Sequence, residues 1–231
     1  MDETPIDINV SPSLHPHNVV AIEGYESDPA LNETYRAFAT AYSAISAIAT
    51  AREGARANPE WNEAAQLIAV ADYADRKQVE ATMAFDKANS TLTRHIGMLE
   101  SALSAPLTAG ALQPLSREIR DHVRSLPTSK RAAFMHEAMQ RGDTQSLGAV
   151  LGAPSFLTGL QPAEVNLYTR RFNEMSNPNA AKRLASLKRA HELVGERGPL
   201  IWPGVVKAVG ASWEKVNALR TEKAKATKAF A

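Results

Sequence analysis

Three things are missing from this sequence: cysteine, long apolar runs, and the strand-like alternation of apolar and polar residues. Without cysteine the chain has no disulfides, thiolate metal ligands or cysteine nucleophiles, and it suits a reducing compartment. No run reaches the roughly 18 to 20 apolar residues that span a bilayer. No segment alternates with period two for long enough to predict a β-strand. We therefore expect an all-α protein with no membrane span.

Motifs that carry known chemistry are also missing. None of the six histidines lies four residues from another, so neither the helical metal pair nor the HExxH pattern occurs. There is no GxSxG sequence that would mark a serine nucleophile. His15 and His17 could share a metal, but Pro16 places them in a segment that we expect to be flexible. We predict that the chain is not an enzyme and holds no metal or cofactor.

Charge is unevenly distributed, although the formal net charge is only +1. Residues 1–30 carry six acids and no lysine or arginine, whereas residues 182–231 carry eleven bases and four acids. Ends of opposite sign can attract each other, within one subunit or between neighbouring subunits. The first ten residues, MDETPIDINV, are acidic and lack the apolar region of a signal peptide, so we expect no secretion.

Residues 1–28 contain several prolines and no helical period, which predicts an extended acidic arm. A helix is expected to begin at Asp28-Pro29, because aspartate can cap the first turn and proline suits it. Its apolar residues repeat in steps of four and three, a heptad seam, and it is expected to end near 54–57. A second helix with a seam of the same spacing is expected from Asn58-Pro59 to about Ser104.

The short link between these two helices predicts a long antiparallel hairpin over about 29–104. At 1.5 Å per residue the second helix is about 70 Å long, so its last turns project beyond the first helix. The apolar side chains of this tip need a partner, which is either the C-terminal half or another subunit: Leu92, Ile96, Leu99 and Leu103. The charged residues between Asp72 and Glu80 are expected to form a solvated face, with Asp72 paired to Arg76.

Residues 106–231 are expected to form a bundle of short helices that follows a linker-like stretch, SAPLTAGALQP. Helices are predicted at 114–126, 128–141, 143–151, 162–176 and 178–194, and most begin near a proline or a capping residue. A last helix is expected from Pro203 towards Phe230, with Trp213 on its apolar stripe. The predicted domains are therefore 1–28, 29–105 and 106–231.

The stretch LGAVLGAPSFLTGL, residues 147–160, is rich in glycine and almost without polar residues. It lacks the Lys-Ser/Thr that follows the glycines of a phosphate-binding loop, and no strand precedes it. Fourteen residues are too few to span a bilayer. We predict a buried elbow, in which Gly152-Ala153-Pro154 ends one helix and Gly159 turns the chain into the next. An exposed Phe156 or Leu157 would instead indicate a docking knob.

These features favour a structural or assembly protein of a large multi-subunit complex, which acts through helix packing and the exchange of arms or tails. The composition suits a bacteriophage virion component, such as a connector, core or internal protein, located in the virion or the bacterial cytoplasm. The expected partners are further copies of the chain or other subunits, bound through the tip residues Leu92, Ile96, Leu99 and Leu103 and through Trp213 and Phe156. The alternative is nucleic-acid binding by the basic C-terminal helix, through Lys215, Arg220, Lys223, Lys225 and Lys228.

Overall fold

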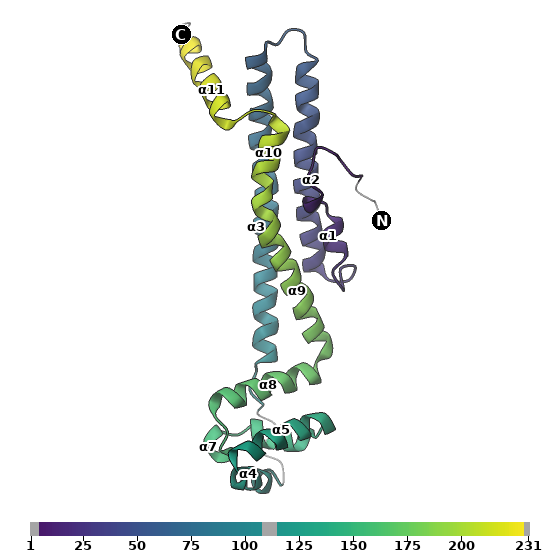
Figure 1. Ribbon diagram of the computed structural model, residues 1–231, viewed down its shortest axis with the longest axis vertical. Coiled ribbons are helices and arrows are strands. Elements are labelled where there is room, and N and C mark those ends of the chain that lie inside the picture. The colour runs from purple at the N-terminus through teal and green to yellow at the C-terminus, as the bar shows by residue number, and fades with distance from the viewer. Residues whose placement is uncertain (1–4, 108–114, 229–231) are drawn as a thin grey trace. The chain divides into compact units, whose positions relative to one another are not determined.

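The computed structural model describes residues 5–107 and 115–228, and these residues form helices and connecting turns with no strand (Figure 1). The prediction of an all-α protein is confirmed. The chain divides into two compact units: unit 1 comprises the residues up to His95 together with Ser186 onward, and unit 2 comprises Ile96–Ala185. Two helices, α3 (Glu63–Leu103) and α9 (Pro178–Arg197), run from one unit into the other. No helix among the described residues is long and apolar enough to cross a membrane.

Unit 1 is built on the predicted hairpin, formed by α2 (Pro29–Arg56) and the first part of α3 (Figure 1). The N-terminus of α2 is capped as expected, because the Asp28 carboxylate accepts a hydrogen bond of 2.8 Å from the Ala30 amide. The rings of Phe38 and Phe85 lie 4.9 Å apart between the two helices. The second seam is buried at its small residues, which allow the helices to approach closely: Ala71, Ala74, Ala81 and Ala88.

The start of α3 differs from the prediction. The helix begins at Glu63, and the cap is Asn62, whose side-chain oxygen accepts a hydrogen bond of 2.8 Å from the Ala65 amide. Asn58 instead holds a turn, where its side chain accepts from the Glu60 amide at 2.9 Å. A helix that began at Asn58 would follow the end of α2 almost at once and would leave no residues to reverse the chain.

The N-terminal segment is not the extended arm that the prolines predicted. It forms a 3-10 turn, η1 (Pro12–Leu14), and a short helix, α1 (His17–Val20), and both contact α2. Leu14 and Val19 are completely buried. The Asn18 side chain donates to the carbonyls of His15 and Pro12 at 2.8 and 3.0 Å, and thereby satisfies the backbone of the turn. Burial of a few apolar side chains therefore folds this segment despite its prolines.

The C-terminal part of unit 1 returns to the hairpin, so residues 186–231 belong with it, whereas the sequence grouped them with the short helices. The expected single last helix is two helices, α10 (Ile201–Val209) and α11 (Trp213–Lys228), which follow the short η3 (Gly198–Leu200). The chain breaks at Gly210, whose φ of +80° is a conformation that favours glycine. The expected end at Phe230 lies outside the described residues.

Unit 2 is a cluster of short helices: α4 (Ser116–Ser125), α5 (Thr128–Arg141), α6 (Thr144–Leu151), α7 (Ser155–Thr158) and α8 (Pro162–Ser176). The predicted bounds of α5 and α8 are confirmed, and α9 begins at Pro178 as predicted. Its core is apolar: Val123, Met135, Met139, Leu147, Val150, Leu151 and Leu160. The buried Asn173 amide donates to the carbonyls of Leu103 and Ala105, both at 3.0 Å, and so caps the end of α3.

The stretch 147–160 forms α6, a turn and α7, and it contributes Leu147, Val150 and Leu160 to that core. Gly159 has a φ of +71°, as the expected turn requires. The Arg131 guanidinium donates to the Gly159 carbonyl at 2.6 Å and fixes the corner. Phe156 is nevertheless 72% exposed, so this elbow is buried on one side and open on the other. Residues 108–114 of the expected linker lie outside the described residues.

Candidate interaction groove

The basic helix α11 lies against the beginning of α3 and is held there by ion pairs. Lys215 contacts Glu63 at 2.8 Å, and one nitrogen of Arg220 contacts Asp72 at 2.6 Å and Asp75 at 2.7 Å. Val216 is the only residue of the described helix that is fully buried. Asp72 therefore pairs with Arg220 rather than with the expected Arg76, whose guanidinium lies 5.7 Å from the centre of the Tyr73 ring.

In these ion pairs the pKa of the acid Glu63 is lowered and that of the base Arg220 is raised, as expected when opposite charges stabilise each other. The hydrogen bond from Lys215 lowers the pKa of Glu63 below its usual value. Partial burial lowers the pKa of Arg220, but the hydrogen bonds to Asp75 and Asp72 outweigh that effect and raise it overall. Both shifts favour the charged forms, so α11 docks on α3 as a cationic helix on an acidic surface.

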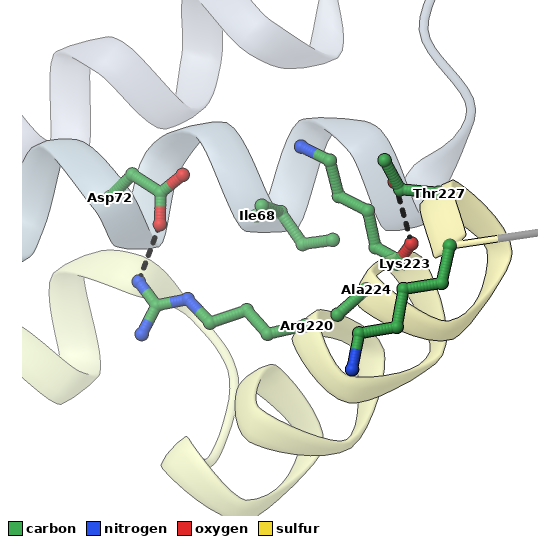
Figure 2. A pocket seen from close by; sticks show the side chains of 7 residues that line it. Ile68, Asp72, Arg220, Lys223, Ala224 and Thr227 are labelled. Atoms are coloured by element: carbon green, nitrogen blue, oxygen red, sulfur yellow. Dashed lines mark hydrogen bonds and ion pairs between the residues drawn. The ribbon is translucent and has the colours of Figure 1, made fainter. Parts of the chain in front are cut away.

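Two hollows flank α11, and we call them together the α11 groove. One has a volume of about 430 Å³ and includes Ile68, Asp72, Arg220, Lys223, Ala224, Thr227 and Lys228 in its lining. Figure 2 shows Arg220 reaching Asp72 on one side of Ile68, with Lys223 and Thr227 on the other. The second has a volume of about 620 Å³, and its apolar lining is formed by Trp61, Ala64, Ala65, Ile68, Ala69, Leu219 and Ala226. The groove therefore combines an apolar floor with three basic side chains, those of Arg220, Lys223 and Lys228, and two acidic ones, those of Asp72 and Glu222.

All three tryptophans of the chain lie in or beside α11. Trp61 lines the larger hollow and is 41% exposed. Trp213 opens α11, and its ring meets that of Trp202 edge to face at 4.8 Å. Trp202 is 40% exposed, and the Arg220 guanidinium lies 6.0 Å from the centre of the Trp213 ring. Exposed tryptophan is characteristic of protein-binding surfaces, where this residue contributes a large share of the binding energy.

The residues of the expected hairpin tip are largely covered within the chain. Leu92 is fully buried and Leu103 is 2% exposed, so neither side chain is available to a partner. Ile96 and Leu99 are half-buried. The sequence predicted that these side chains need a partner, either the C-terminal half of the chain or another subunit. Most of their burial is provided within the single chain.

The basic residues of the C-terminal helix fall into two groups. Lys215 and Arg220 are held in ion pairs with α3, so they are not free to neutralise phosphates. Lys223, Lys225 and Lys228 are exposed, and none of them forms an ion pair with another described residue. Lys223 and Lys228 line the groove, whereas Lys225 does not.

Phe156 belongs to unit 2 and is a separate exposed site. It is 72% exposed, which is the condition under which the sequence predicted a docking knob in place of a wholly buried elbow. Other large apolar side chains of unit 2 are also more than half exposed, namely Met98, Leu115 and Leu167. The sequence placed Phe156 and Trp213 in one set of partner-binding residues, but they lie in different units.

The α3 side of the groove was not among the predicted site residues; it is formed by Trp61, Ala65, Ile68 and Ala69. The sequence held one signal for Trp61. This residue directly precedes Asn62, which caps α3, so its side chain lies outside the helix and cannot belong to the apolar seam of the hairpin. The pairing of Asp72 and Asp75 with Arg220 had no local signal, since 148 and 145 residues separate the partners.

No group of three or more potential metal ligands comes together within residues 5–107 and 115–228. No protein-family model matches the chain, and neither the curated proteins nor the solved structures contain a significant match.

Proposed function

We propose that the chain is a non-enzymatic structural subunit that assembles with further copies of itself into a larger complex. The observation that carries this proposal is the gathering of all three tryptophans around α11, beside an apolar groove bordered by exposed lysines. Aromatic anchors with a polar rim are the usual composition of protein–protein interfaces.

The proposed setting is a bacteriophage virion, in which the chain would be a connector, core or internal protein. The support for this setting is compositional: the sequence has no cysteine, is rich in alanine, and has an acidic beginning and a basic end. The proposed location is accordingly the virion or the cytoplasm of an infected bacterium.

A second candidate function, nucleic-acid binding, is favoured by one observation, the three exposed lysines Lys223, Lys225 and Lys228. It is the weaker candidate, because Lys215 and Arg220 are engaged with acids of α3. Binding through several phosphates would fall steeply between low and moderate salt. Replacing all three lysines by glutamine and measuring DNA binding over a salt series tests this function directly.

The proposed function is tested by the mass of the purified full-length chain in native mass spectrometry and sedimentation over a range of concentrations. We expect a defined oligomer, and we expect Trp61→Ser to weaken it. Met83→Ser is the matched control, because Met83 is a 66% exposed residue of α3 that does not line the groove. A chain that stays monomeric at every concentration contradicts the proposal.

A further inference from the structure

We propose that the α11 groove binds the N-terminal segment of a second copy of this chain, residues 2–8. This inference rests on the proposed function, because it names the contact through which the copies would assemble. It follows from two features of unit 1: an acidic segment in which Ile6 and Ile8 are exposed, and an apolar groove with exposed lysines at its border.

The first feature is the segment itself, DETPIDI. Ile6 and Ile8 are 83% and 91% exposed, which is unusual for two isoleucines separated by one residue. Asp7 between them is anchored on α2: its amide donates to the Tyr42 hydroxyl, and its carboxylate accepts from the Ser46 hydroxyl, both at 2.5 Å. The chain therefore presents two apolar side chains from a fixed point, in a region with no basic residue among the first 30.

The second feature is the groove, which offers what such a segment requires. Its larger hollow has an apolar lining that includes Trp61, Ala65 and Leu219, where isoleucine side chains can be buried. Lys223 and Lys228 stand at the groove without an ion-pair partner among the described residues, so they are free to meet the acids of the segment. Opposite charges would also steer the encounter and fix its orientation.

The occupant is a second copy rather than the chain's own N-terminus. In unit 1 the described part of this segment, residues 5–8, lies beside α2, whereas α11 lies beside α3 at the other side of the hairpin (Figure 1). Asp7 holds the segment on α2, and both isoleucines remain exposed there. A contact between two different surfaces of identical subunits is heterologous, so it generates a closed ring or an open filament.

A matched pair of charge reversals tests the groove. Lys223→Glu and Lys225→Glu change the net charge equally on exposed positions of the same helix, but only Lys223 lines the groove. We expect Lys223→Glu to raise the dissociation constant of the oligomer about tenfold, and Lys225→Glu to change it less than about threefold. Equal effects of the two variants would overturn the inference, because they would show a dependence on net charge alone.

A mixing experiment tests the identity of the occupant. Ile6→Ser/Ile8→Ser leaves the groove intact, and Lys223→Glu/Lys228→Glu leaves the segment intact. Each double variant alone should be monomeric, with unchanged circular dichroism, because all four side chains are exposed. An equimolar mixture should form a one-to-one heterodimer and stop there, since only one intact pair of surfaces remains.

The outcomes separate this inference from the proposed function. A wild-type monomer overturns both. A wild-type oligomer that survives in both double variants, or a mixture that gives no heterodimer, overturns the groove contact and leaves self-assembly standing. Restoration of the oligomer when Asp2→Lys/Glu3→Lys is combined with Lys223→Glu/Lys228→Glu in one chain supports a direct charge contact.

Discussion

The last two helices of unit 1 are consecutive in the sequence but are held in different ways. Helix α10 contacts α2 through buried residues: Ile201, Val205, Ala208 and Val209. Helix α11 buries only Val216 among its described residues and is fixed to α3 by Lys215 and Arg220. The first contact depends on apolar burial and the second on charge. This difference implies that α10 belongs to the folding core, whereas α11 can be released while the core remains intact.

The largest expected effect comes from the apolar contact. Ile45 of α2 is fully buried and packs against Gly204 of α10. A Cβ added to Gly204 would lie only 2.8 Å from the Cδ1 atom of Ile45. We predict that Ile45→Ala lowers the free energy of unfolding by about 2 to 5 kcal/mol, the usual range for a buried isoleucine. Because all three tryptophans lie in unit 1, urea titration followed by tryptophan fluorescence reports this loss. Ile8→Ala, at a 91% exposed position, is the control and should have almost no effect.

The joint between the two helices should show an intermediate effect. Gly210 has a φ of +80°, and an added Cβ would lie 2.7 Å from Nη1 of Arg52, which donates to the Lys207 carbonyl at the end of α10. We predict that Gly210→Ala destabilises unit 1 by about 1 to 2 kcal/mol, because alanine is strained in this conformation. Gly54→Ala is the matched control, since Gly54 is helical with nothing within 4 Å of an added Cβ. It should stabilise the chain slightly, and a loss there equal to that at Gly210 would contradict the argument.

A smaller effect on global stability is expected from the charged contact. The Arg220 side chain is 28% exposed, and ion pairs that are accessible to water contribute about 1 kcal/mol or less. Arg220→Gln should therefore leave the urea midpoint nearly unchanged but increase amide hydrogen exchange across α11, without a change in α10. The control is Arg189→Gln, which removes an exposed ion pair between Arg189 and Glu192, both of which lie on α9. Increased exchange in both helices would show that α11 is part of the core.

The same contrast explains which parts of the fold could be predicted from the sequence. Local signals were sufficient for the hairpin, where a capping Asp28, Pro29 and two heptad seams specify helix type and partner. They were also sufficient for α5 and α8, whose bounds agree with the prediction. The return of residues 186–231 to the hairpin had no local signal. Arg220 and Asp72, which form one of its contacts, are 148 residues apart in the sequence and meet only in the folded chain.

The prediction of an extended N-terminal arm was wrong for a related reason. Its prolines argued against a helix of any length, but a fold can use turns shorter than any periodic pattern, and Leu14 and Val19 are buried by such turns. The groove was missed because its apolar side comes from α3 and its basic side from α11. Of the residues that line the groove, only the basic Arg220, Lys223 and Lys228 were predicted as site residues, and they suggested nucleic acid.

The smallest expected effect comes from acidification, which weakens the charged contact between α11 and α3. Lys215 lowers the pKa of Glu63 from its ordinary value of 4.5, so the stabilisation from this pair is complete above that value. It is lost as the pH falls through the lowered pKa, because protonated Glu63 no longer attracts Lys215. We therefore predict that hydrogen exchange in α11, corrected for its intrinsic pH dependence, is constant from pH 7 to 5 and rises below about pH 4.5. Glu63→Gln should show the raised exchange already at pH 7 and a smaller further rise on acidification. If α10 were released over the same pH range, the two helices would form one cooperative unit, and the groove between α11 and α3 would be a fixed part of the core.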